Sequence, residues 1–118
     1  MIPTKVSTPQ NIGGRETMYA CLINDSDRQP QVQVVMSVRV EGPPIESKSI
    51  SVRALTQDGS EVALRSISPK ELVVWSSGGS GSAYSVWQIV DGRDDVALVQ
   101  VLYRDAGYSF ELRDYSPG

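Results

Sequence analysis

The sequence predicts an all-β protein, a two-sheet antiparallel β-sandwich of about eight strands, and one segment carries most of this prediction. In Gln31–Glu41 the even positions are all apolar, whereas the odd positions are polar apart from Val35. Side chains of a strand alternate between two faces, so this spacing predicts a strand with one buried and one exposed face. We expect it to be the longest strand, with the rest of the chain covering its buried face. The buried positions are Val32, Val34, Met36, Val38 and Val40.

The rest of the chain alternates between strand-like segments and turn signals, and no stretch has a long helical pattern. Residues 1–15 are predicted to be a flexible N-terminal arm, in which Thr4–Ser7 has the composition of a short edge strand. Residues 16–115 form the sandwich, and 116–118 a C-terminal tail. The eight predicted strands are Thr17–Ile23, Gln31–Glu41, Ser47–Leu55, Glu61–Ile67, Glu71–Ser76, Tyr84–Val90, Val96–Arg104 and Ser109–Arg113.

The segments between these strands are rich in residues that favour turns. Thr17–Ile23 is apolar at both parities, which indicates a strand covered on both sides or a helical turn. The strand is preferred because the run is short and ends at a polar loop, Asn24–Pro30. Proline stops the strand ladder within Gly42–Pro44, because proline lacks a backbone N–H. Ser68–Lys70 and Asp91–Asp95 are predicted to be the later turns.

Two hairpins have a register that the apolar residues predict. A three-residue loop at Gln57–Gly59, with Gly59 in the left-handed conformation, pairs Val52 with Leu64 and Ala54 with Val62. The last hairpin turns around Asp105–Tyr108. An even-length loop there pairs Tyr103 with Phe110 and Val101 with Leu112.

Composition excludes several classes of function. The chain has 118 residues, 40% of them hydrophobic and 21% charged, with a net charge of −3 and scattered basic residues. A nucleic-acid partner is therefore not expected, because binding to phosphates requires a basic face. No run is long enough to span a bilayer, and the N-terminus lacks the apolar region of a signal peptide. One cysteine and no signal favour the cytoplasm, although a secreted mature domain stays open.

Catalysis is also not expected. The chain has no histidine, which removes the usual general base and the usual zinc ligand. Its single cysteine, Cys21, lies in an apolar run and is predicted to be a buried, inert side chain. A hydrolase with paired carboxylates, such as Asp94 and Asp95, is the remaining enzymatic alternative. We predict no enzyme, no catalytic residue and no cofactor.

The strand order loosely resembles an immunoglobulin-like architecture. Cys21 lies where such domains often place a cysteine in their second strand, and Val101 stands where the second cysteine would be. The third strand has no tryptophan. The resemblance is an architectural analogy and implies no family.

If every connection reverses the chain direction, alternate loops share one end of the sandwich. Asn24–Pro30, Gln57–Gly59, Ser77–Ser82 and Asp105–Gly107 then lie together. Four carboxylates would meet there as candidate calcium ligands, namely Asp25, Asp27, Asp58 and Asp105. Aspartate at each position is also explained by turn formation, so no metal site is predicted.

The strongest candidate for binding is the loop Ser77–Ser82, which consists only of glycine and serine. We predict that it is mobile and that the aromatic residues beside it frame a groove. Trp75 and Trp87 also alternate correctly for core positions. The candidate binding residues are Trp75, Ser77, Gly78, Gly79, Ser80, Gly81 and Tyr84.

The expected function is a non-catalytic interaction module that recognises a protein or glycan through loop ends or a strand edge. The alternative is a structural subunit of a larger assembly, such as a phage or secretion particle, whose N-terminal arm becomes ordered on a neighbour. The sequence leaves the oligomeric state open.

Overall fold

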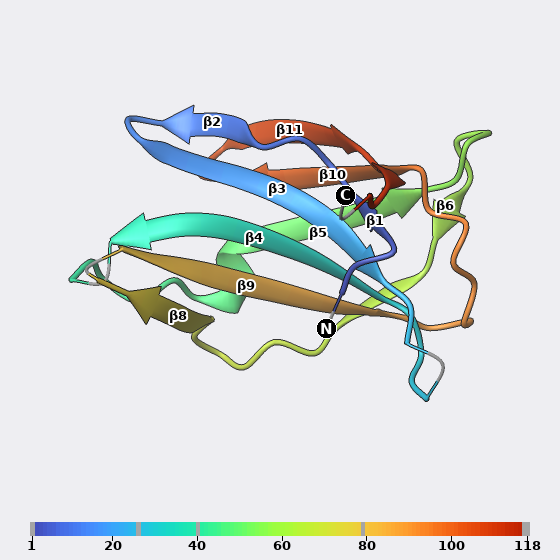
Figure 1. Ribbon diagram of the computed structural model, residues 1–118, viewed down its shortest axis with the longest axis horizontal. Coiled ribbons are helices and arrows are strands. Elements are labelled where there is room, and N and C mark those ends of the chain that lie inside the picture. Colours follow the sequence, from blue (N-terminus) through green and yellow to red (C-terminus); the bar gives the residue numbers. More distant parts are fainter. Residues whose placement is uncertain (1, 26, 40, 79, 117–118) are drawn as a thin grey trace.

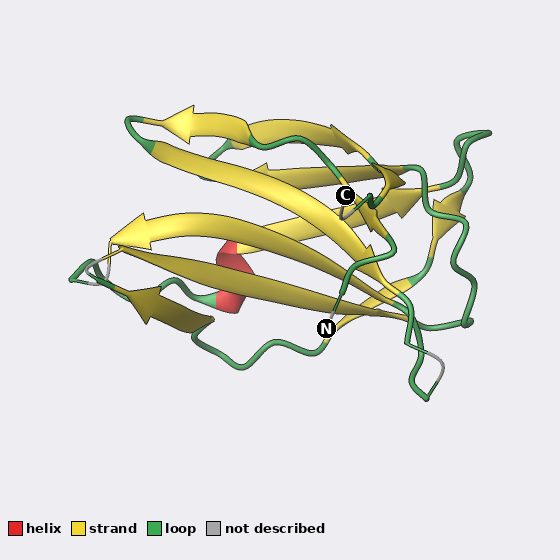
Figure 2. Cartoon of the chain, in the orientation of Figure 1, coloured by secondary structure: helices red, strands yellow, loops and turns green. Residues whose placement is uncertain are grey.

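The structure is a computed structural model that describes residues 2–25, 27–39, 41–78 and 80–116. Strands dominate it, and the one helix within this part of the chain is a short 3-10 turn (Figure 2). No helix among the described residues is long and apolar enough to cross a membrane. The elements are β1 (Lys5–Val6), β2 (Gln10–Gly13), β3 (Glu16–Ile23), β4 (Gln31–Arg39), η1 (Ser47–Ser49), β5 (Ile50–Leu55), β6 (Glu61–Val62), β7 (Leu64–Ser66), β8 (Val73–Ser77), β9 (Ser80–Ile89), β10 (Leu98–Tyr103), β11 (Ala106–Glu111) and β12 (Arg113–Asp114).

The strands form two antiparallel sheets, which confirms the predicted all-β sandwich. The larger sheet has the order β12-β1-β3-β4-β9-β7, with β2 also paired to β3 and β8 to β9. The smaller sheet has the order β11-β10-β5-β6. The immunoglobulin-like arrangement stays a prediction.

The segment with the clearest alternation, β4, lies in the middle of the large sheet between β3 and β9 (Figure 1). Val32, Val34 and Met36 are at most 1% exposed, so the predicted buried face is confirmed at these positions. Val38 is only partly buried because it lies near the end of the strand, and Val40 lies outside the described residues. β4 is not the longest strand, since its 9 residues compare with 10 in β9.

The core lies between the two sheets. It is built from the inward-facing side chains of β3, β4 and β9 on one side and of β5, β10 and β11 on the other. Phe110, at 1% exposure, heads the fully buried side chains by size. Val62 of β6 also joins the core, as do Leu72 and Val96 from the connecting segments.

The hairpin after β5 agrees with its prediction only near the turn. Ala54 pairs with Val62, and Gly59 has a φ of 87°, the left-handed conformation expected there. The predicted pairing of Val52 with Leu64 is wrong. The chain leaves the small sheet after Val62, and β7 pairs with β9 in the large sheet.

The turn predicted at Ser68–Lys70 is also wrong, because the chain has already moved to the large sheet at β7. β7 and β8 both pair antiparallel with β9, so the chain continues in one direction along the edge of the large sheet. Ser68 stays attached to β9, because its Oγ accepts a hydrogen bond from the Val86 N–H at 2.7 Å. Pro69 has no N–H to donate, and the ladder is interrupted there.

The last hairpin turns earlier than predicted. Val99 pairs with Phe110, and Val101 with Tyr108. The predicted pairings of Phe110 with Tyr103, and of Leu112 with Val101, are therefore wrong. Arg104 and Asp105 form a two-residue turn with φ values of 52° and 62°. Such turns are usually signalled by glycine or asparagine, and neither is present here.

The N-terminal segment pairs with the sheet through β1 and β2, and β1 lies within Thr4–Ser7, where a short strand is expected; the flexibility of the arm stays a prediction. Val6 of β1 pairs with Cys21, and Gln10 of β2 pairs with Met18. β12 pairs with β1 and so attaches the C-terminal end of the domain to the same edge.

Candidate functional site

The segment predicted to be a flexible glycine-serine loop is mostly strand. Ser80, Gly81 and Ser82 begin β9 and pair with both β8 and β4. Pairing at both edges satisfies the backbone of this segment, and this outweighs the weak strand propensity of glycine and serine. Gly78, with a φ of 62°, belongs to the tight turn, and Gly79 lies outside the described residues. The six-residue loop is therefore wrong in extent.

The two tryptophans lie on opposite faces of the large sheet. Trp87 is opposite Val32 on the inner face and packs against the core, and its indole N–H donates to Ser85 Oγ at 2.9 Å. Trp75 is opposite Ser82 on the outer face, and 70% of it is exposed. Trp87 therefore has the core position that its alternation allows, whereas Trp75 does not.

The outer face carries an apolar row that crosses four strands. Tyr19, Val35, Tyr84 and Val73 are successive partners on β3, β4, β9 and β8. A groove of about 450 Å³ lies over the part of this face next to β1, lined by Tyr19, Val35 and Tyr84 together with Cys21 and Tyr115. Burial, with Cys21 and Tyr84 nearby, raises the pKa of Tyr19 above its ordinary value.

The prediction from sequence found Tyr84 but not the rest of this row. Two signals were present: the apolar residues at both parities of Thr17–Ile23, and Val35 at an otherwise polar position of β4. Both indicate strands with apolar side chains on two faces. The row became visible only when β3, β4, β9 and β8 were placed side by side.

The outer edge of the sheet at β8 is open. β8 pairs with β9 on one side, and no described residue pairs with its other side. Three consecutive side chains along it are exposed: Val73 at 46%, Val74 at 42% and Trp75 at 70%. The segment just before β8 does have a backbone partner, because the Leu72 N–H donates a hydrogen bond to the Ile45 carbonyl at 2.8 Å.

Cys21 is buried, as predicted, with 5% of its surface exposed. Burial raises the pKa of its thiol to about 11, against a hydrogen bond from the Gln33 backbone that lowers it. The raised pKa means that the neutral thiol stabilises the fold fully below pH 9. This contribution is lost as pH rises through about 11.

We therefore expect Cys21 to resist thiol reagents in the native protein, because the thiolate is the reactive form. A disulfide reagent at pH 8 should label no cysteine until urea unfolds the chain, and should then label one per chain. Rapid labelling without urea would contradict both the burial and the raised pKa.

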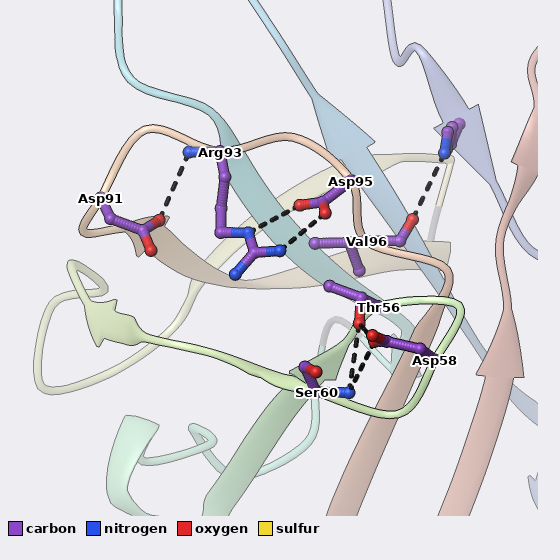
Figure 3. Close-up of polar contacts among 8 residues, drawn as sticks. Thr56, Asp58, Ser60, Asp91, Arg93, Asp95 and Val96 are labelled. Carbon is purple, nitrogen blue, oxygen red and sulfur yellow. Dashed lines mark hydrogen bonds and ion pairs between the residues drawn. The ribbon is translucent and has the colours of Figure 1, made fainter.

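Three loop carboxylates, those of Asp58, Asp91 and Asp95, accept hydrogen bonds from donors in their own loops (Figure 3). Arg93 binds both oxygens of Asp95, with both N–O distances 2.7 Å. Asp58 accepts hydrogen bonds from the Thr56 hydroxyl and the Ser60 N–H, which lower its pKa. These contacts are those of structured turns.

The predicted grouping of loops holds for Asn24–Pro30 and Gln57–Gly59, which share an end, but is wrong for the loops that follow Ser68–Lys70. Asn24 Nδ2 donates to Asp94 at 2.7 Å, and Asp58 interacts electrostatically with Arg93, so these three loops share an end. The turn at Arg104 lies with Ser80 at the other end. Because the chain does not reverse direction at Ser68–Lys70, each later loop lies at the end of the sandwich opposite to the predicted one.

The four candidate calcium ligands are consequently not brought together, since Asp105 belongs to the turn at the opposite end from Asp58. Among the described residues, no three His, Cys, Asp or Glu side chains are placed to hold a metal ion.

Comparison with known proteins gives no match to a protein-family model, a curated protein or a solved structure.

Proposed function

We propose that this protein is a non-catalytic binding module that takes up an extended protein segment along the open edge of β8. The observation that carries the proposal is the run of three exposed apolar side chains, Val73–Trp75, on a strand with one unpaired side. Strand addition of this kind uses backbone hydrogen bonds for affinity and side-chain contacts for specificity.

An open edge is usually protected by charged residues, proline or a bulge, because it otherwise recruits other strands. Val73–Ser77 contains neither charge nor proline. The nearest charged residues along the chain, Lys70 and Glu71, come before the exposed run. The exposed edge therefore has the composition of a surface that is covered in the working protein.

The alternation of β8 indicates what the added segment contains. Val73 and Trp75 are on the outer face, beside Tyr84 and Ser82, and Val74 is on the inner side, beside Ala83. A partner strand would place its own side chains on both faces in the same alternation. An uncharged segment with apolar residues facing Trp75 fits best, with Trp75 as the main anchor, since exposed tryptophan is favoured at binding surfaces.

A polypeptide is preferred over a glycan as the partner because the unpaired side of β8 offers backbone donors and acceptors at strand spacing. A glycan would use Trp75 but not this row of backbone groups. The absence of histidine from the sequence supports the non-catalytic character of the proposal.

The test is selection of peptides from a random displayed library, followed by affinity measurement with two variants. We expect selected peptides to lose about tenfold or more in affinity for Trp75→Lys, as for truncation of a central anchor. Leu102→Lys is the matched control, because Leu102 is 55% exposed on the smaller sheet. Hydrogen exchange should show β8 amides protected in the complex.

Four outcomes would overturn the proposal. Equal binding by Trp75→Lys, or protection outside β8, would mean that the edge is not the site. A preference for glycans over peptides would assign Trp75 to sugar binding. A dimer in sedimentation analysis that Trp75→Lys abolishes would assign the edge to a second copy and favour the structural-subunit alternative.

A further inference from the structure

The large sheet splits at one end. Pairing between β3 and β4 stops at Met18 and Met36, although β3 continues with β2 as far as Glu16 and β4 continues with β9 as far as Arg39. Figure 1 shows β3 diverging from β4 toward the β2–β3 turn. In the split, the Oγ atom of Ser37 accepts a hydrogen bond from the Thr17 N–H at 2.7 Å, in place of a backbone partner.

A groove of about 640 Å³ lies at this split end. One wall comes from the β2–β3 turn, where Gly13 and Gly14 carry no side chain and leave the backbone accessible. Ser37 and Ser80 also line it. The groove is distinct from the edge of β8, so an inference about it stands independently of the proposed function.

The groove collects positive charge in an acidic protein. Arg15, Arg39 and Arg104 line it, with Glu16 as its one acidic lining residue, which leaves a local charge of +2 against −3 for the chain. They reach it from three separate places: the β2–β3 turn, the end of β4 and the β10–β11 turn. The fold therefore assembles this group from residues far apart in the sequence.

The three arginines differ in what they already contact. Arg104 Nη1 lies 3.3 Å from Glu16 Oε2, and its guanidinium carbon is 4.9 Å from the centre of the Tyr103 ring. These contacts orient Arg104 within the groove. Within the described residues, the guanidinium groups of Arg15 and Arg39 have no hydrogen-bond or ion-pair partner. Two complete sets of donors are thus available to a ligand.

We propose that this groove binds a phosphate group, either as a monoester or as inorganic phosphate. Guanidinium groups bind phosphate oxygens through paired N–H donors, and a phosphate monoester carries nearly two negative charges at neutral pH. This charge matches the local +2. A carboxylate has about half the charge and fewer acceptor oxygens, so it would match the local charge and the donors of two unpaired arginines less well.

Titrations at low ionic strength, followed by NMR of the arginine side chains and of the Glu16 and Ser37 amides, test the proposal. The probes are inorganic phosphate, phenyl phosphate and acetate. We expect saturable binding of both phosphates and weaker binding of acetate. Arg39→Gln and Arg15→Gln should each reduce phosphate affinity about fivefold to tenfold, as for loss of a charge-assisted contact.

Arg28→Gln is the matched control, because Arg28 is an exposed arginine in the loop at the opposite end. It should leave phosphate affinity unchanged. Tighter binding of phenyl phosphate than of inorganic phosphate would identify an ester as the natural source, and the reverse would identify the free anion. Shifts that never saturate, equal affinity for acetate, or an equal loss in Arg28→Gln would overturn the proposal. Since the substituted arginines are exposed, thermal melting should confirm that every variant is folded.

Discussion

Met36→Ala is expected to cost about 2–5 kcal/mol in the free energy of unfolding, the usual range for truncation of a buried methionine. Met36 is 1% exposed and lies opposite Met18 on β3 and Ala83 on β9, so both neighbouring strands contact the site. A close-packed interior cannot fill the vacated volume without shifting the strands. Urea unfolding at constant m-value measures the loss.

Val38→Ala is the matched control for this prediction. Val38 has the same parity on β4 but is only partly buried, so its truncation should cost less than that of Met36. A loss below about 1 kcal/mol for Met36→Ala would contradict the burial of the inner face. So would a larger loss for Val38→Ala than for Met36→Ala.

The same alternation explains why so much of the fold was predictable. In β4 a period of two separates apolar from polar positions, and the burial of Val32, Val34 and Met36 follows from that pattern. All eight predicted strands contain strand residues in the structure. Local pattern predicts strands well because each strand must present one apolar face to the core.

The local sequence pattern does not show with which other strand each strand pairs. The segment around Glu61–Ile67 is strand-like, but nothing in it says that Val62 stays in the small sheet while Leu64 enters the large one. That division decides the direction of every later element. One missed change of sheet therefore misplaced the loops at both ends, including the aspartate cluster.

The candidate site was predictable in part. Trp75 and Tyr84 were identified as aromatic residues near a hairpin, and the structure places them on one face of neighbouring strands. Trp75 itself could not be assigned to core or surface from sequence, because alternation fits both faces. The arginine groove was not predictable, since Arg15, Arg39 and Arg104 come from three distant segments.

Phe110→Ala is expected to lower the free energy of unfolding by about 3–5 kcal/mol, the range for truncation of a buried phenylalanine. This loss is at least as large as that expected for Met36→Ala. Phe110 is 1% exposed and lies in β11, which pairs only with β10 in the small sheet among the described strands. Removing the ring deprives this edge strand of its main contact with the core. The urea midpoint should fall accordingly, whereas Leu102→Ala, which truncates an exposed residue on β10, should change stability by about 0.5 kcal/mol or less.

A double-mutant cycle extends this prediction to the register of the last hairpin. Phe110 is opposite Val99, so Val99→Ala and Phe110→Ala should be coupled by about 0.5 kcal/mol or more. This pairing follows from the early turn at Arg104 and Asp105. Purely additive losses would mean that the two side chains are not in contact, and would favour the register in which Phe110 faces Tyr103.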